Sequence, residues 1–113
     1  LVEDDETFRY AAQAGLETAG FRVLSSGSVK TALSILASDA PDLLLTDIRL
    51  MGNIDGLVLS SMARVQRPTL PVLFITGFEE LVSKAADYGR VLVKPVELDA
   101  LVAAVRKELA KSP

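Results

Sequence analysis

Three short runs of consecutive apolar residues constrain the fold of this chain most strongly. Each run follows a proline or glycine, and its apolar residues occupy successive positions without alternating with polar ones. A strand that is apolar on both sides has to be covered on both sides, which is typical of a parallel sheet with helices above and below it. The runs are 43–45, 72–75 and 91–93, and Leu1 with Val2 and 21–24 are two further expected strands.

The segments between these runs change to the period of a helix. Their apolar residues recur at spacings of three or four, and residues typical of helix ends stand at their boundaries. The segment 79–88 is short and has few side chains that can pack, so we expect a frayed or displaced helix there. The expected helices are 8–19 with Gly20 as its stop, one after the N-cap Ser28, one after Asp55 and Gly56, and 98–109.

This order of strands and helices predicts a single α/β domain. A strand followed by a helix occurs five times, and right-handed crossovers then give a three-layer, doubly wound, five-stranded parallel sheet. The expected fold is the flavodoxin-like (βα)5 type with strand order 2-1-3-4-5. The length of 113 residues fits one domain, 1–113. Because the chain begins at Leu1 and not at Met, we expect the first residues of the first strand to be missing.

Composition excludes several classes of function. Twelve basic and fifteen acidic residues give a net charge of −3, so no broad basic surface is expected for nucleic acid or anionic lipid. The chain has no cysteine and no histidine, which excludes thiol chemistry and the commonest general base and leaves oxygen atoms as metal ligands. Neither a membrane-spanning run nor a signal peptide pattern is present, and we expect a cytoplasmic location.

Polar side chains stand where the expected strands end. Glu3 and Asp4 follow the first strand, Asp47 the third, Thr76 the fourth and Lys94 the fifth. In a doubly wound sheet these ends form one rim, where ligands bind. Three acids at one rim raise one another's pKa unless a cation neutralises them, and Mg2+ prefers oxygen ligands. A metal beside a lysine and a threonine suits an anionic oxygen group, and the carboxylate of Asp47 can form an acyl phosphate as nucleophile.

Each of these features alone has a simpler explanation. Adjacent acids before a helix usually cap it, and we assign that role to Asp5 and Glu6. An aspartate after a strand is most often a turn residue, and a Lys-Pro pair is most often a loop. Their coincidence at the ends of four expected strands favours a functional site.

These motifs resemble the receiver domain of two-component response regulators, over nearly the whole chain. The resemblance implies a signalling switch and not an ordinary enzyme, since a receiver catalyses only its own phosphorylation and dephosphorylation. It implies a sensor histidine kinase or histidine phosphotransfer protein as donor, an unidentified effector protein or output domain, and a phosphorylation-dependent homodimer. The motifs are Val2-Glu3-Asp4, Pro41 to Asp47, Asp55-Gly56, Pro71 to Thr76 and Val93-Lys94-Pro95.

The resemblance also implies a role for individual residues. Asp47 matches the phospho-acceptor, and the absence of histidine agrees with a donor histidine on the partner. The remaining implied roles are Mg2+ ligation by Asp4, Asp47, the backbone carbonyl of Arg49 and, through water, Glu3; phosphoryl binding by Lys94 and Thr76; and a cis-proline at Pro95.

The chain departs from the family pattern at two places. Val91 stands where the family usually has an aromatic residue, three positions before the lysine, and the loop 50–54 is one residue longer than usual. The stretch 74–78 resembles a Phe-x-Thr-Gly-aromatic variant of many stand-alone receivers. We therefore expect Phe78, with Gly77 as hinge, to replace the usual moving aromatic group. We also expect Arg49 and Phe78 to flank the path of the hydrolysing water and to tune the lifetime of the acyl phosphate.

Three alternative functions compete with this interpretation. A haloacid-dehalogenase-like phosphatase has its nucleophile on the first strand with an acid two residues later, whereas here Asp47 follows the third and is followed by Arg49. A flavodoxin-like phosphate binder uses backbone N–H groups, while Glu3, Asp4 and Asp5 would repel a phosphate. The third alternative, a degenerate receiver acting as a phosphorylation-independent interaction module, stays open.

Overall fold

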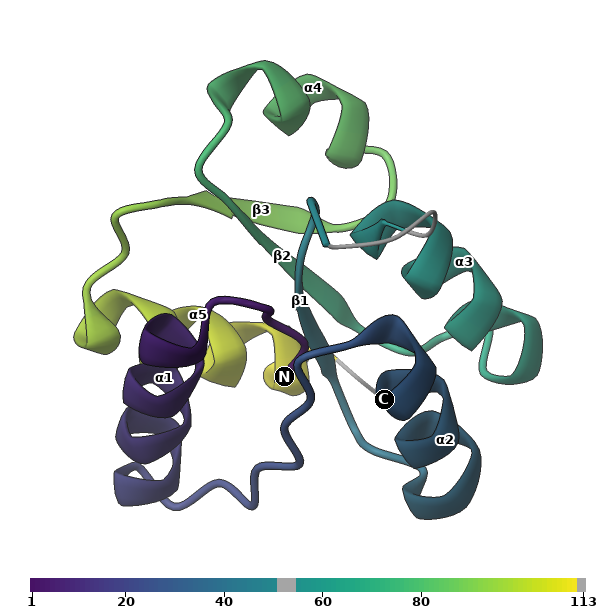
Figure 1. Cartoon of the computed structure of the whole chain (residues 1–113), viewed down its shortest axis with the longest axis horizontal. Helices are drawn as coiled ribbons and strands as arrows, with labels where there is room; N and C mark the ends of the chain where they lie inside the picture. The colour runs from purple at the N-terminus through teal and green to yellow at the C-terminus, as the bar shows by residue number, and fades with distance from the viewer. Residues whose placement is uncertain (51–54, 112–113) are drawn as a thin grey trace.

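A parallel sheet covered by helices forms the centre of the molecule (Figure 1). The computed structural model describes residues 1–50 and 55–111. The helices and strands in these residues are α1 (Glu6–Thr18), α2 (Val29–Asp39), β1 (Leu44–Asp47), α3 (Gly56–Gln66), β2 (Val72–Thr76), the 3-10 turn η1 (Glu79–Leu81), α4 (Val82–Ala85), β3 (Arg90–Val93) and α5 (Leu98–Ala110). The strands pair in parallel in the order β1-β2-β3.

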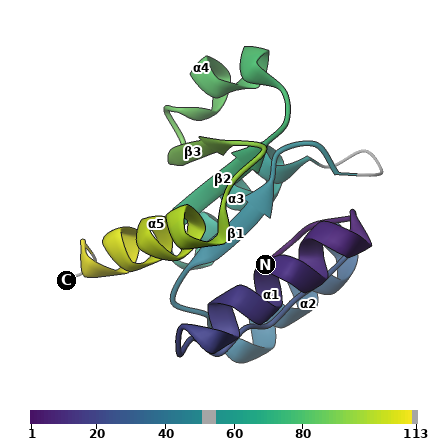
Figure 2. The same ribbon diagram turned by 90° about the vertical axis from the view of Figure 1, so that its left-hand side faces the viewer.

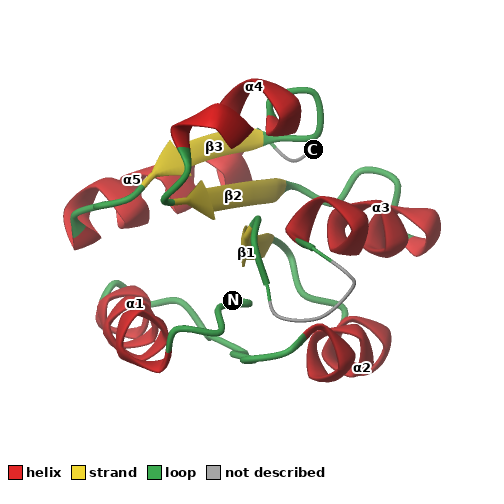
Figure 3. Ribbon diagram, turned by 45° about the horizontal axis from the view of Figure 1, so that its top comes forward, coloured by secondary structure: helices red, strands yellow, loops and turns green. Residues whose placement is uncertain are grey.

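The helices lie in two layers, with the sheet between them (Figure 3). Leu45, Leu73 and Ile75 pack against α1 and α5, whereas Leu44 and Phe74 pack on the side of α2 and α3. Successive strand residues point to opposite faces, so a run that is apolar at every position fills both layers. The predicted three-layer α/β fold is thus confirmed. No helix in the described residues is long and apolar enough to cross a membrane.

The first two expected strands form only single bridges. Val2 pairs in parallel with Ser26 on one side and with Thr46 on the other. The segment 21–24 is not a strand, so the prediction of a strand there is wrong for this structure. The register gives the reason, because with Val2 opposite Ser26 a parallel partner of 21–24 would have to precede Leu1. The five-stranded order 2-1-3-4-5 stays a prediction. It places the first strand between the second and the third, and the bridges of Val2 to Ser26 and to Thr46 agree with that position.

Three helices begin after a capping residue, and of these residues Asp5 and Ser28 were predicted. The side chains of Asp5, Ser28 and Asp55 each accept hydrogen bonds from backbone N–H groups in the first turn of the following helix. Gly20, the predicted stop, follows α1 with a φ of 101°. The weak segment 79–88 divides into η1 and the four-residue α4, which lies beside β3 (Figure 2). The frayed helix expected there is confirmed.

The start of α3 lies directly against the end of β1. The N–H of Gly56 donates to the carbonyl of Ile48 at 2.7 Å, and a Cβ atom at position 56 would lie 2.0 Å from the carbonyl oxygen of Asp47. Only glycine allows this approach, which holds the end of β1 in place. Of the loop 50–54, predicted to be one residue longer, positions 51–54 lie outside the described residues.

Candidate functional site

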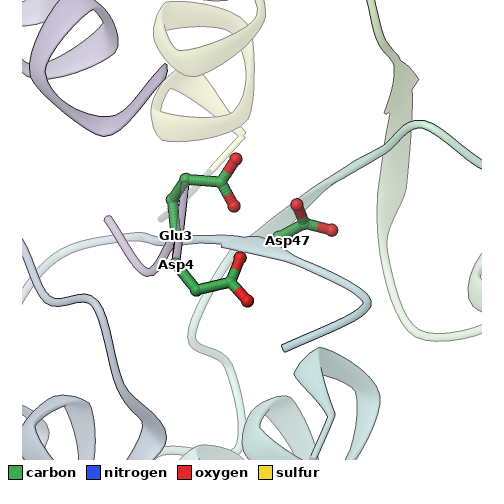
Figure 4. A group of neighbouring side chains, drawn as sticks. All are labelled: Glu3, Asp4 and Asp47. Atoms are coloured by element: carbon green, nitrogen blue, oxygen red, sulfur yellow. The ribbon is translucent and has the colours of Figure 1, made fainter. Parts of the chain in front are cut away.

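Three carboxylates meet at the carboxyl end of β1 (Figure 4). Glu3, Asp4 and Asp47 each place one carboxylate oxygen within 4.8 Å of the others. Glu3 and Asp4 reach this position because the bridge between Val2 and Thr46 sets the first residues of the chain beside β1. Glu3 is 1% and Asp47 8% exposed, whereas Asp4 is half-buried. The acids of the first and third expected strands therefore share one small pocket.

The cation between two of these acids is the ammonium group of Lys94. Its Nζ lies 2.5 Å from Oε1 of Glu3 and 2.8 Å from Oδ2 of Asp47. The backbone N–H of Lys94 donates to the carbonyl of Thr76 at 2.7 Å, and the Lys94–Pro95 peptide bond is cis. Three carboxylates and one ammonium leave a formal charge of −2, which one divalent cation would balance.

The electrostatics of the pocket single out Glu3. Burial raises its pKa to about 7, with the hydrogen bond and charge of Asp47 acting in the same direction and Lys94 opposing them. Burial lowers the pKa of Lys94, but its hydrogen bonds to Asp47 and Glu3 outweigh this effect and raise it. Oε2 of Glu3 is buried and has no hydrogen-bond partner among the described residues. A buried, unpartnered carboxylate oxygen beside two further acids fits a hard cation with oxygen ligands.

The residues after β1 and β2 meet next to Asp47. The N–H of Arg49 donates to Oδ1 of Asp47 at 3.2 Å, and the guanidinium carbon of Arg49 lies 4.3 Å from the ring centroid of Phe78. Thr76 is fully buried, and its hydroxyl oxygen accepts a hydrogen bond from the N–H of Phe78 at 3.1 Å. Phe78 is 43% exposed, so an exposed cation–π pair lies beside the pocket. Ligation by the Arg49 carbonyl stays a prediction.

Val91 and Gly77 are the two other positions on which the expected movement of Phe78 depends. Val91 lies in β3 and packs against the core between the sheet and α3. A Cβ atom at Gly77 would meet no atom within 4 Å, and the φ of Gly77 is not in the left-handed region. The backbone therefore does not require glycine at 77 in this structure, and the hinge role of Gly77 stays a prediction.

Sequence reasoning missed two residues of the pocket. The ring centroid of Phe8 lies 4.6 Å from Nζ of Lys94, and Nη1 of Arg9 donates to the backbone carbonyl of Glu3 at 2.8 Å. In the sequence, Phe8 marks only the start of the expected helix 8–19, and Arg9 has no predicted role. Both residues lie in the first helix, one turn after Asp5 and Glu6. Their closeness in sequence to Glu3 and Asp4 at the rim is the signal that could have identified them.

Comparison with known proteins finds response regulators and their receiver domains. A family model described as the response regulator receiver domain matches residues 1–106. The DNA-binding transcriptional regulator NtrC of Salmonella typhimurium is 32% identical over 114 residues, which cover 97% of this chain and 24% of NtrC. The response regulator receiver protein CpdR of Brucella abortus is 36% identical over 113 residues, which cover 96% of this chain and 93% of CpdR.

A solved structure agrees with these sequence matches. The crystal structure of the receiver domain of NtrX from Brucella abortus has a TM-score of 0.90 at 29% identity, and the match covers 98% of this chain and 97% of that one. The first curated relatives are much longer than the region they share with this chain, which spans about a quarter of their length.

Proposed function

The chain belongs to the response regulator receiver domain family, and from this premise we propose that its switch operates through phosphorylation of Asp47. The proposed donor is a phosphohistidine of a sensor histidine kinase or of a histidine phosphotransfer protein, and the absence of histidine from this chain agrees with a donor histidine on the partner. The observation that carries the proposal is the position of Asp47, whose carboxylate contacts Lys94 and shares a pocket with two further acids. As a receiver domain, the chain is a signalling switch.

The contacts of Asp47 suit it to accept a phosphoryl group. Its two oxygens are held by different donors, Oδ1 by the N–H of Arg49 and Oδ2 by Lys94, so the orientation of the carboxylate is fixed. In the proposed step a carboxylate oxygen forms a bond to phosphorus while the bond from phosphorus to the donor imidazole nitrogen breaks, and that nitrogen keeps the electron pair. Such a transfer needs positioning and charge neutralisation more than a base, and the ammonium of Lys94 supplies part of that charge.

We propose that Glu3, Asp4 and Asp47 hold Mg2+ together with the backbone carbonyl of Arg49, with Glu3 acting through water. The formal charge of −2 and the unpartnered Oε2 of Glu3 support a divalent cation with oxygen ligands. When bound, Mg2+ supplies positive charge that offsets the charge on the transferred phosphoryl oxygens.

Incubation with acetyl phosphate, followed by intact-mass measurement, tests the proposed function. The chain is expected to gain the mass of one phosphoryl group when Mg2+ is present, and to gain none when the metal is removed by a chelator. A protein that takes up no phosphoryl group under either condition would instead be the degenerate receiver, a phosphorylation-independent interaction module.

The raised pKa of Glu3 predicts how Mg2+ binding depends on pH. Glu3 carries a proton below its pKa of about 7 in the metal-free protein, so protons compete with the metal there. Affinity measured by calorimetry should therefore rise with pH, by up to about tenfold per pH unit below pH 7, and level off above it. Glu3→Gln should flatten this rise, because the amide does not titrate. An equally steep rise in Glu3→Gln would contradict the assignment.

We propose that Phe78, with Gly77 as hinge, moves when the domain is phosphorylated. Thr76 supports this, because a hydroxyl that turns towards a phosphoryl group at Asp47 gives up its hydrogen bond to the N–H of Phe78. With Val91 in the place of the usual aromatic residue, we propose Phe78 as the ring that responds, because its N–H is hydrogen-bonded to the hydroxyl oxygen of Thr76. Phosphorylation shifts the equilibrium only as far as the phosphoryl group favours one state.

The cation–π pair of Arg49 and Phe78 is expected to slow hydrolysis of the acyl phosphate. The N–H of Arg49 contacts Asp47, and we expect the paired side chains of Arg49 and Phe78 to obstruct the approach of water there. An exposed cation–π contact is worth about 0.5–1 kcal/mol, so Arg49→Ala and Phe78→Ala should each speed phosphate loss by about two- to fivefold. Val65→Ala, at an 81% exposed position on α3, is the control and should leave the rate unchanged. Unaltered rates in both pocket variants would contradict this role.

The relatives support two kinds of effector, an output domain in the same chain or a separate protein. NtrC is named a DNA-binding regulator and extends far beyond the shared region, whereas CpdR is matched over 93% of its length. We propose that phosphorylation changes a protein-binding surface read by an effector protein or an output domain, and that it favours a homodimer. The proposed location is the cytoplasm, where sensor kinases present their phosphohistidines. With a net charge of −3, this domain is not proposed to bind nucleic acid itself.

A further inference from the structure

One aromatic ring contacts the cation of the acidic pocket. The Nζ atom of Lys94 lies over the ring of Phe8, 4.6 Å from the ring centroid. A cation at this distance from a ring face is attracted by the electron density of the ring. The same ammonium group donates to Oε1 of Glu3 and to Oδ2 of Asp47. The ammonium of Lys94 is therefore held by two carboxylates and one ring.

The position of this ring is fixed by the hydrophobic core. Phe8 is half-buried and packs against the core cluster that contains Ala12, Leu16 and Ile75. Its backbone N–H donates to Oδ1 of the capping residue Asp5 at 3.4 Å, so the backbone at this position is held as well. A lysine side chain, in contrast, is a flexible four-carbon stem. The fixed ring therefore constrains the flexible cation, and not the reverse.

The backbone of Lys94 is held in place, but its side chain has to be held separately. The backbone N–H of Lys94 donates to the carbonyl of Thr76 at 2.7 Å. The side chain is 22% exposed, and its long stem allows the ammonium group to reach many positions. The contacts at the end of the stem select the position between Glu3 and Asp47. Each of these contacts therefore contributes to placing the charge.

The ring differs from the two carboxylates in its part in the proposed reaction. Glu3 and Asp47 are proposed Mg2+ ligands, and Asp47 is also the proposed phospho-acceptor, so both carboxylates change partners during the reaction. The ring of Phe8 is no metal ligand and forms no covalent bond. Its attraction for the ammonium group is therefore the same before and after phosphorylation, and it is the constant contact at the end of the Lys94 side chain.

We propose that Phe8 is a positioning residue whose ring face holds the ammonium group of Lys94 beside the carboxylate of Asp47 for phosphoryl transfer. This inference rests on the proposed function of Asp47 and Lys94. A leucine at position 8 can also pack against the core, so packing alone does not require an aromatic residue. Leucine has no ring face that attracts a cation, however, and the role of Phe8 therefore depends on its ring.

Trifluorophenylalanine at position 8 tests this inference at nearly constant side-chain volume. The fluorine atoms withdraw electron density from the ring face and so weaken its attraction for a cation. In the unphosphorylated protein, NMR should show that the ammonium protons of Lys94 exchange with water about three- to tenfold faster, as expected for a contact between the exposed and the desolvated case. Phosphoryl uptake from acetyl phosphate should slow by a similar factor. Phe8→Leu should change both rates in the same directions.

Phe21 offers the matched control. Its ring is also half-buried and packs against the same core cluster, and its centroid lies 5.8 Å from the guanidinium carbon of Arg106. Trifluorophenylalanine at position 21 therefore makes the same chemical change at a cation–π contact with a different cation. It should leave both the ammonium exchange of Lys94 and the rate of phosphoryl uptake at the values of the parent.

Three results would overturn the inference. In the first, the ammonium group of Lys94 exchanges equally fast with phenylalanine and with trifluorophenylalanine at position 8. In the second, the substitution at position 21 has the same effect as that at position 8. In the third, exchange is faster but uptake keeps the parent rate. A parent that takes up no phosphoryl group would refute the proposed function and the role in transfer, whereas the exchange measurement, which needs no phosphorylation, would still decide whether Phe8 holds Lys94.

Discussion

Replacing Asp47 with asparagine is expected to reduce phosphoryl uptake from acetyl phosphate by at least about a thousandfold, to below detection. The amide oxygen can still accept the hydrogen bond from the N–H of Arg49, so the local backbone should stay in place. The amide is a poor nucleophile, however, and forms no acyl phosphate. Intact-mass measurement after incubation with the phosphodonor and Mg2+ gives the result directly.

The fold should survive this substitution. Asp47→Asn removes one negative charge from a pocket with a formal charge of −2, and Lys94 keeps its partner Glu3. Thermal unfolding should therefore show a midpoint at or above that of the parent. Asp42→Asn is the matched control, because it makes the same chemical change at an exposed position and should leave uptake intact. Continued phosphorylation of Asp47→Asn, mapped to another carboxylate such as Asp4, would refute the assignment.

Gly56→Ala is expected to destabilise the fold and to impair the site at once. A Cβ atom there would lie 2.0 Å from the carbonyl oxygen of Asp47. This is a steric clash, so the start of α3 and the end of β1 have to separate. Overpacking of this kind lowers the free energy of unfolding by about 3 kcal/mol, which for a domain of this size lowers the midpoint by more than about 10 °C.

The same shift displaces Asp47 from its contacts with Lys94 and Arg49. A displacement of about 1 Å can slow a transfer reaction by about a hundredfold, so uptake should fall even at temperatures where the variant is folded. Gly77→Ala is the control for stability, because a Cβ atom there meets no atom within 4 Å. A Gly56→Ala protein as stable as the parent, with an unchanged rate of uptake, would show that the contact relaxes without consequence.

The elements that the sequence predicts well are those whose signals are local. Runs at 43–45, 72–75 and 91–93 are apolar at every position, and in the structure they correspond to β1, β2 and β3. Ser28 caps the helix it was expected to cap, because a side chain that accepts an N–H bond three residues away needs no tertiary context.

The failures concern interactions between distant parts of the chain. The segment 21–24 has the composition of a strand, but a strand exists only where a partner lies beside it, and residues opposite 21–24 would precede Leu1. The site was predicted as a set of strand ends, and the acids and Lys94 do meet there. The direct contact of Lys94 with both Glu3 and Asp47 did not follow from the sequence, because strand order alone does not fix how far a flexible side chain reaches.

The ion pair between Lys94 and Glu3 joins residues that are 91 positions apart. The pocket is therefore complete only when both ends of the folding unit have been synthesised and have met. A nascent chain still emerging from the ribosome, or a fragment cleaved anywhere between these two residues, lacks the full set of charges around Asp47. The charge balance around Asp47 therefore depends on contact between the first residues of the chain and a residue near its other end.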